Sequence, residues 1–560
     1  MKLSNVFLLF LSMVALLSCG GDNATPSGKA LEELKLKRGP IILCGPADKE
    51  FGIVNFVIDG SEMVRRDFNT AVELLHSFEY DEAEKVFAKI IDESPGCVMA
   101  YWGVAMCNFH PLWESPSEND LIKGSKAISI AGSIKRRSAK EAAYMDAVAA
   151  YYKDWDKTDA HSRCIHFEKA MEQLHERYPT DKEGAIFYAL ALDAAASPTD
   201  KSYVNQKKAG RILDSLYALA PNHPGIIHYI IHTYDYPGLA ALALPAARRY
   251  AEVAPSSAHA LHMPSHIFTR LGLWDESIRS NTRSVEAARC YAESMGVRGH
   301  WDEELHGLDY LIYAYLQRGD NKAADQELKY LGTIAEVNPA NFKVAYTFAA
   351  SPCRWALENR KWAEAARLPL QPFSFPWDKF PWQEAIVHFG RLLGSAHTGD
   401  AHAAQTELSK LDTLYDRLVR QNDAYKARQV EIQITAGKAW IANLNGKKME
   451  ALRLMKLAAD MEDSTSKSPV TPGEVLPARE LYADLLLDLH KNEAAFKEYE
   501  MVLGKCPNRF NSLSGAGLAA ERAGDDSGAV HYYRQLLATA APGSDRLELV
   551  AARTFLGKRP

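Results

Sequence analysis

Two pairs of histidines recur in this chain at a spacing of 34 residues, and that spacing limits what the chain can fold into. The pairs are His228 with His232, and His262 with His266. Within each pair the residues are spaced i,i+4, so both imidazoles project from one face of a helix. Pro221 and Pro255, which precede the pairs, are also 34 residues apart. A 34-residue period is typical of helix–turn–helix units that stack into a solenoid.

The same period organises small and aromatic residues elsewhere in the chain. In residues 74–107, Ala83, Phe87 and Pro95 occupy positions 20, 24 and 32 of one unit, and Tyr101 and Ala105 occupy positions 4 and 8 of the next. Near the C-terminus the matching residues are Ala495, Tyr499, Pro507, Leu513, Gly517, Gly524, Ala529 and Tyr533. This pattern resembles the tetratricopeptide repeat. The resemblance implies an all-α, right-handed superhelical solenoid of antiparallel helix pairs, with about eight to nine repeats.

The segments outside the repeats differ in composition, and they divide the chain. We predict a signal peptide at 1–18, a lipidated cysteine and flexible tether at 19–38, an N-terminal capping segment at 39–63, repeats with a His-rich groove at 64–366, a proline- and aromatic-rich interruption at 367–384, further repeats at 385–545 and a tail at 546–560. A single compact core would be too large for 560 residues, whereas each repeat of a solenoid buries its apolar face on its neighbours. The net charge of −6 and the lack of a basic stripe argue against nucleic acid as a partner.

The N-terminus is typical of an exported protein. Lys2 precedes an apolar stretch over residues 6–17, which is too short to span a membrane comfortably. Leu16-Leu17-Ser18-Cys19 resembles a bacterial lipobox, in which Cys19 is lipidated and becomes the first mature residue; a plain signal peptide with a chance cysteine is the alternative. The polar spacer that follows would act as a tether. We therefore expect a bacterial envelope protein anchored to a membrane by its N-terminal lipid, with inner or outer membrane left open.

The remaining cysteines do not form a recognisable pattern. Seven of them follow Cys19, an odd number without CxxC spacing. This distribution favours small buried core residues over a disulfide framework or a zinc ribbon.

The positions of the histidines within the 34-residue unit place them on one face of the solenoid. His228 and His232 take positions 5 and 9, as do His262 and His266. The other residues on or beside this face are Asp235 at position 12, His259 and His306 at position 2, Asp309 at 5, Tyr313 at 9, and His76 and His110 at 13. In tetratricopeptide proteins the stripe at positions 2, 5, 9 and 12 lines the concave groove, so the resemblance implies that these residues face the inner surface and bind a ligand.

Three chemical roles fit such a histidine-rich face. Imidazoles from both i,i+4 pairs could converge on one transition metal, Zn, Cu or Fe, held by His228, His232, His262 and His266. A His306–Asp309 pair could serve acid–base chemistry. Alternatively, the histidines could be interior hydrogen-bonding residues that join adjacent repeats through nearby tyrosines.

No phosphate-binding loop, dinucleotide-binding motif or nucleophile elbow occurs in the chain. A scaffold that binds a protein, a peptide or a small ligand in its groove is therefore favoured over an enzyme, and a metal-binding protein or metal-dependent enzyme is the alternative. The whole chain also resembles an uncharacterised group of bacterial envelope tetratricopeptide proteins, through segments such as HYIIHTYDYP and HALHMPSHIFTRLGLWDES. That resemblance supports the architecture and implies no activity.

Overall fold

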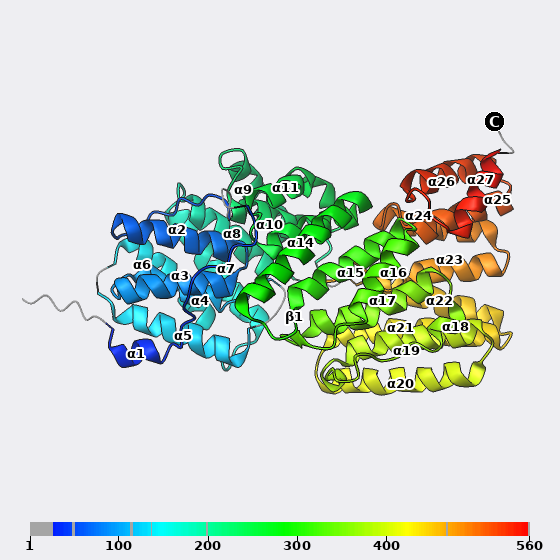
Figure 1. Ribbon diagram of the computed structural model, residues 1–560, viewed down its shortest axis with the longest axis horizontal. Helices are drawn as coiled ribbons and strands as arrows, with labels where there is room; N and C mark the ends of the chain where they lie inside the picture. The colour runs from blue at the N-terminus through cyan, green and yellow to red at the C-terminus, as the bar shows by residue number, and fades with distance from the viewer. Residues whose placement is uncertain are drawn as a thin grey trace, which may run out of the picture.

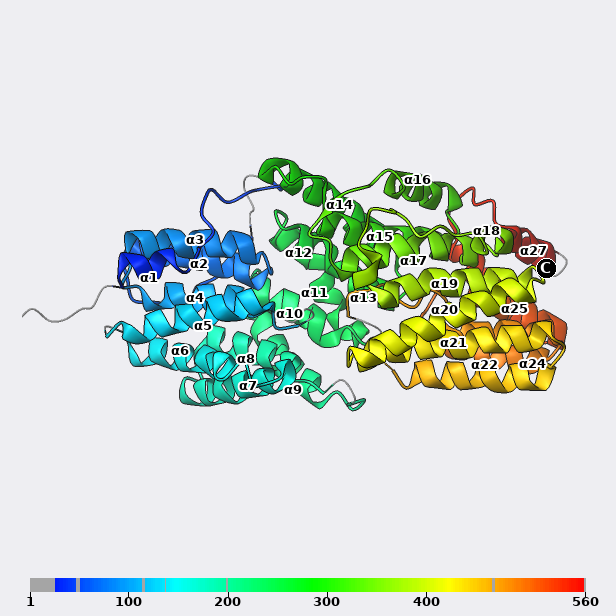
Figure 2. The ribbon, with the colours of Figure 1, turned by 90° about the horizontal axis from the view of Figure 1, so that it is seen from below.

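The structure is almost entirely α-helical. It is a computed structural model that describes residues 26–46, 51–112, 116–135, 137–197, 200–465 and 469–557. The predicted signal peptide and Cys19 lie outside the described residues, so their predictions remain untested. Each helix packs antiparallel on the next along most of the chain, and the molecule is elongated (Figures 1 and 2). The predicted all-α solenoid of helix pairs is confirmed.

The chain forms two halves that follow one another along the long axis (Figure 1). The helices of the N-terminal half are α1 (Gly28–Glu32), α2 (Glu62–His76), α3 (Tyr80–Glu93), α4 (Val98–Cys107), α5 (Glu118–Ser133), α6 (Ala139–Tyr152), α7 (Ala160–Arg177), α8 (Lys182–Ala194), α9 (Val204–Tyr217), α10 (Pro224–Tyr234), α11 (Ala240–Val253), α12 (Ala258–His262), α13 (Pro264–Arg270) and α14 (Trp274–Met295). Those of the C-terminal half are α15 (Asp302–Gln317), α16 (Asn321–Leu331), α17 (Phe342–Glu358), α18 (Trp362–Ala365), the 3-10 helix η1 (Trp377–Lys379), α19 (Pro381–His397), α20 (Ala401–Arg420), α21 (Ala424–Leu444), α22 (Lys448–Asp463), α23 (Ala478–Asp488), α24 (Asn492–Lys505), α25 (Phe510–Ala523), α26 (Asp526–Thr539) and α27 (Leu547–Gly557). Two short parallel strands, β1 (His300–Trp301) and β2 (Val337–Asn338), pair at the join between the halves.

The described residues contain more helix pairs than the eight to nine repeats that the sequence pattern indicates. The additional helices lie in α5 to α9, where the small and aromatic repeat positions are not recognisable. These helices begin with strong local signals instead. Ser138 accepts a hydrogen bond from the backbone N–H of Glu141, whose carboxylate accepts one from the backbone N–H of Ser138. Such a capping box stabilises a helix start by about 1 kcal/mol.

Small residues allow paired helices to approach closely, as the repeat pattern predicts. A Cβ atom on Gly517, at repeat position 8, would lie 2.5 Å from the ring of Tyr533 at position 24 of the same unit. A Cβ atom on Gly103 would lie 2.2 Å from the ring of Phe87. The aromatic rings therefore occupy the space that a larger residue on the facing helix would need.

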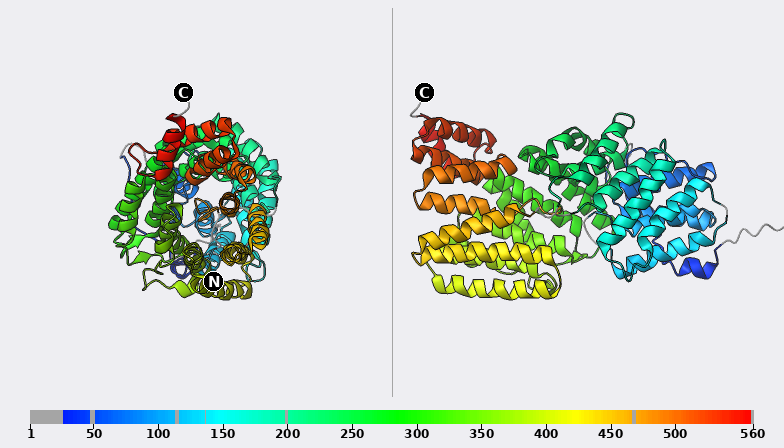
Figure 3. Two further views of the ribbon diagram at one scale, coloured as in Figure 1. Left: turned by 90° about the vertical axis from the view of Figure 1, so that its right-hand side faces the viewer. Right: turned by 180° about the vertical axis from the view of Figure 1, so that it is seen from behind.

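The N-terminal half curls into a turn that closes on itself. Seen along the long axis, the helices of the two halves together surround a central region (Figure 3, left). The end of α2 meets α10, where Nδ1 of His76 lies 2.9 Å from the Tyr229 hydroxyl. Ser257 donates a hydrogen bond to Glu79 (2.6 Å), and Tyr291 donates one to Glu82 (2.8 Å). These contacts bring the first helix pair, α2 and α3, against the fifth and sixth pairs, so the inner face of this turn becomes the interior of the half.

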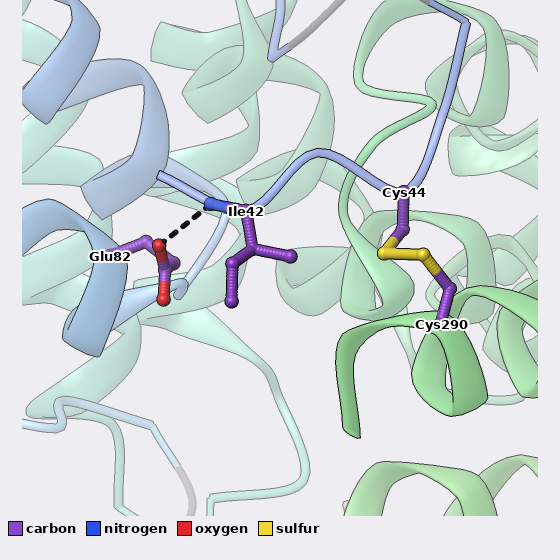
Figure 4. Close-up of a disulfide and its surroundings, with 4 residues drawn as sticks. All are labelled: Ile42, Cys44, Glu82 and Cys290. Carbon is purple, nitrogen blue, oxygen red and sulfur yellow. Dashed lines mark hydrogen bonds between the residues drawn. A yellow bond between two sulfur atoms is a disulfide. The ribbon is translucent and has the colours of Figure 1, made fainter. Parts of the chain in front are cut away.

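A non-helical segment and a disulfide reinforce this closure. Residues 51–58 bury Phe51, Val54, Phe56 and Ile58 against the helices. Upstream, the backbone N–H of Ile42 donates to Glu82 (3.1 Å), and Cys44 forms a disulfide with Cys290 of α14 (Figure 4). The expectation of unpaired cysteines is wrong for these two, because the folded chain brings together residues 246 positions apart, which no sequence spacing reveals. The other described cysteines are free.

The C-terminal half also returns to its own beginning. The Ala541 N–H donates to the Arg318 carbonyl (2.8 Å) at the end of α15. The indole of Trp274, in α14 of the N-terminal half, donates to the Asn508 carbonyl (2.9 Å). Buried Arg509 pairs with Glu358 (2.6 Å) and Glu480 (2.7 Å), which joins α17, α23 and the start of α25. Each half thus has its own main apolar core.

Two segments predicted to lie outside the repeats pack onto them. In the interruption at 367–384, Phe375 contacts Phe348 of α17, with ring centroids 5.5 Å apart, and Trp377 is buried. In the predicted tail at 546–560, α27 buries Leu549 and Phe555 against the last repeat. Among the described residues, every helix is too short or too polar to cross a membrane.

Candidate metal centre

The first histidine pair lies on α10, a helix in which every residue except His232 is buried. Pro224 occupies the first helical turn, and the ring of His223 caps the helix by accepting a hydrogen bond from the Ile226 N–H (3.3 Å). A helix of this kind is stable only when it is surrounded by protein. His228 and His232 project from it toward α12, and His228 is fully buried.

Three imidazoles meet between α10 and α12. Nε2 of His228 lies 3.0 Å from Nε2 of His232 and 3.1 Å from Nε2 of His259. We call His228, His232 and His259 the first tri-histidine group. The Nδ1 of His228 donates a hydrogen bond to the backbone carbonyl of His76 (2.6 Å), because a carbonyl can only accept. In the neutral ring, Nε2 of His228 therefore carries a lone pair that points at the two other nitrogens.

Burial keeps these rings neutral. Removal from water lowers the pKa of His228 to about 3, and it lowers the pKa values of His232 and His259 well below the ordinary value. Neutral imidazole is the form that binds metal ions. The first group is therefore held in its ligand form at neutral pH.

A second tri-histidine group lies beside the first and consists of His262, His266 and His306. Nε2 of His262 is 3.0 Å from Nε2 of His266, and the rings of His262 and His306 have centroids 4.2 Å apart. His306 comes from α15, so the group joins the sixth helix pair to the seventh. The Tyr310 hydroxyl lies 3.4 Å from both ring nitrogens of His266.

The hydrogen bonds behind this group determine where its protons are. Nδ1 of His262 donates to the side-chain oxygen of Asn281 (2.7 Å), whose amide nitrogen is committed to the Ser277 carbonyl (2.8 Å). Nδ1 of His266 donates to the Asp235 carboxylate (3.1 Å). With both Nδ1 atoms protonated, neither Nε2 atom of the neutral rings carries a proton. Two lone pairs therefore face each other at 3.0 Å, an arrangement that a cation between them would stabilise.

The nitrogen spacing fits a transition metal. Imidazole nitrogens bound to zinc lie 2.0–2.1 Å from the ion, so two nitrogens on a tetrahedral ion are about 3.3–3.4 Å apart. The observed separations of 3.0 and 3.1 Å differ from this by a few tenths of an ångström. Three imidazoles per group and no sulfur ligand suit Zn, Cu or Fe.

A third buried cluster has a different character. The Glu183 carboxylate accepts hydrogen bonds from His76 (3.0 Å) and His223 (2.8 Å), and His76 also contacts the Tyr229 hydroxyl. These bonds join α2, α8 and α10, and His223 keeps its second nitrogen as the helix cap. This cluster matches the predicted role of histidines as interior hydrogen-bonding residues, and it supports the first group because the His76 carbonyl orients His228.

The predicted site residues therefore separate into three sets. The four histidines expected to share one ion lie in two groups, since His259 completes the first and His306 the second. All six are inside the protein rather than along an open groove, because α2 closes over the inner face; His232 alone is only partly buried. Asp235 orients His266.

The remaining predicted residues lie away from both groups. Asp309, suggested from the sequence as an acid–base partner of His306, forms an ion pair with buried Arg354 of α17. Tyr313 accepts a hydrogen bond from Arg509 (3.3 Å). His110 stacks on Tyr80, with ring centroids 4.8 Å apart, and does not reach the centre.

Two residues that position the centre were not found from the sequence. Asn281 belongs to a stripe of small polar residues on a buried face of α14, namely Ser277, Ser280, Asn281 and Ser284. A polar stripe with helical spacing inside an otherwise apolar repeat is the signal that could have indicated Asn281.

The second residue, Phe78, has a backbone φ of 58° at repeat position 15, where Gly319 and Gly524 occur in other repeats. A bulky residue in this conformation costs about 1–2 kcal/mol, and its ring stacks on His232 and His259 with centroids 5.6 and 5.7 Å away.

Comparison with known proteins adds little to this geometry. No family model and no curated protein matches the chain. Among solved structures, a human IFIT1 dimer with PPP-AAAA aligns at 11% identity over 84% of this chain and 95% of that chain, with a TM-score of 0.35. Naa15/Naa10 bound to HypK-THB aligns at 10% identity over 89% and 96%, with a TM-score of 0.23. Likenesses this distant carry no argument about ligand or partner.

Proposed function

We propose that this protein binds transition metal ions in the interior of its N-terminal half. The observation that carries the proposal is the contact between His262 and His266. Their Nε2 atoms lie 3.0 Å apart while both Nδ1 atoms donate hydrogen bonds to fixed oxygen acceptors. A bound ion would accept both lone pairs and remove their mutual repulsion. The solenoid serves as a rigid scaffold that brings histidines from α10, α12, α13 and α15 together.

An open groove that recruits a peptide has less support. Such a groove needs accessible side chains, and the histidines predicted to line it are buried or nearly so. Transition metal ions are small enough to bind among buried imidazoles. The structure therefore favours metal binding over the peptide-binding scaffold that the sequence favours.

The metal proposal can be tested on protein purified without chelator and without metal-affinity chromatography. Elemental analysis should find copper, zinc or iron in the wild type, and added Cu(II) or Zn(II) should saturate any unfilled sites. The His262→Ala/His266→Ala variant should lose the ion bound by the second group. His402→Ala, on the exposed face of α20, is the matched control and should retain the wild-type metal content. A folded wild type that neither contains metal nor takes it up at micromolar concentration would refute the proposal.

We also propose that the protein is exported and anchored through Cys19. The support is the lipobox-like Leu16-Leu17-Ser18-Cys19 segment, together with the Cys44–Cys290 disulfide, since disulfides form in oxidising compartments outside the cytosol. A metal site on the envelope side of the membrane would load from the metal ions of that compartment.

A further inference from the structure

We propose that the two tri-histidine groups form one dinuclear centre, in which two ions lie side by side and share a small oxygen ligand such as hydroxide. This inference rests on the proposed metal-binding function. It adds that the groups act together, that each ion has a coordination position open toward the other, and that the ligand between them is a single small oxygen donor.

The two groups are contiguous. The rings of His232, in the first group, and His266, in the second, have centroids 6.5 Å apart. The rings of His232 and His259 are also 6.5 Å apart, although both belong to the first group. The distance across the boundary between the groups is thus no greater than a distance within one of them.

A single short helix connects the two groups. The α12 helix contributes His259 to the first group and His262 to the second, three residues later. The i,i+3 spacing places both side chains on the same face of α12. The α10 helix approaches this face from one side with His228 and His232, and α13 and α15 approach from the other with His266 and His306. Any movement of α12 would change both groups together.

Coordination and charge both favour an oxygen ligand between the ions. Three imidazoles leave at least one position open on a four-coordinate ion. Two divalent ions would add four positive charges to a buried region in which all six ligands are imidazoles, which bring no negative charge. The nearest carboxylate to the second group, Asp235, is already paired with Arg270 (2.8 Å). An anionic oxygen shared by the ions would fill both open positions and offset part of this charge, and a metal ion makes hydroxide available near neutral pH by lowering the pKa of bound water.

The surroundings limit the size of the shared ligand. The Phe78 ring is stacked on His232 and His259, and it meets His228 edge-on with centroids 4.4 Å apart. The Tyr310 ring lies against His262 and His266, with centroids 4.7 and 5.0 Å away. Aromatic rings therefore pack directly against both groups, which favours a small shared ligand over an organic substrate.

Copper titration with electron paramagnetic resonance tests the inference. The full-length protein is loaded with Cu(II), the bound copper is counted by elemental analysis, and the resonance signal is integrated. We expect two copper ions per wild-type chain and a signal far below two spins, because an oxygen bridge couples the two unpaired electrons. His306→Ala should bind one copper ion and show the full signal of one isolated spin, and His259→Ala should behave in the same way from the other side.

The outcomes separate this inference from the proposed function. Two ions that give two full, independent spins would overturn the shared centre, and one ion per wild-type chain would overturn it while leaving metal binding intact. No copper uptake by folded wild type would refute both. Because alanine variants can unfold, His306→Asn and His259→Asn are measured in parallel with circular dichroism, and the wild-type copper count and spin count decide the question without any variant.

Discussion

Breaking the Cys44–Cys290 disulfide should remove a large part of the stability of the N-terminal half. The bond joins residues 246 positions apart, so it closes most of that half into one covalent loop. The chain-entropy relation for a loop of this length gives about 5 kcal/mol, and native disulfides contribute roughly 2–5 kcal/mol. Because a whole domain is stable by only about 5–15 kcal/mol, this effect should be plain in an unfolding experiment.

The assay is urea unfolding of wild type and of a Cys44→Ser/Cys290→Ser variant, each with and without reductant. Wild type should lose about 2–5 kcal/mol when reduced. The variant should match reduced wild type and should not respond to reductant. Cys506→Ser removes a free thiol and should behave like wild type. Equal stability of wild type and the double variant, or denatured wild type in which Cys44 and Cys290 both react as free thiols, would refute the reasoning.

Three further predictions concern the centre, its surroundings and the anchor. Asp235→Asn should weaken metal binding by the second group about 10- to 100-fold in a chelator competition, because the carboxylate orients His266; unchanged affinity would contradict this role. Burial raises the pKa of Asp193 to about 8, so the folded protein holds the carboxyl proton more tightly than the unfolded chain does. The free energy of unfolding is therefore highest below about pH 4, where both states are protonated, and falls as the pH rises to 8. Between pH 4 and 8 the free energy of unfolding of wild type should fall by up to about 1.4 kcal/mol per pH unit relative to that of Asp193→Asn. If the two proteins show the same dependence of stability on pH, the Asp193 carboxyl is not desolvated. Cys19→Ser should release the protein from the membrane fraction or leave it unprocessed, and unchanged detergent partitioning would argue against lipidation.

The features that depend on local spacing were predictable from the sequence. Helical periodicity, the 34-residue repeat and the alternation of small and aromatic residues act between neighbours along the chain, and they correctly predicted paired helices and contacts such as Gly517 with Tyr533. The i,i+4 spacing of the histidine pairs likewise predicted that both members of each pair meet at one point, as the 3.0 Å contacts show.

The features that depend on how tightly the solenoid curls were decided only by the tertiary structure. The return of α2 to α10 turns the inner face into an interior, buries the histidines and brings the His76 carbonyl onto His228. The same closure joins Cys44 to Cys290. The packing of α17 on α15 places Arg354 beside Asp309, so the Asp309 carboxylate pairs with Arg354. A small rotation added at each repeat sums over many repeats to set this curvature. Which histidines share an ion therefore depends on the whole turn, and no single 34-residue unit contains that information.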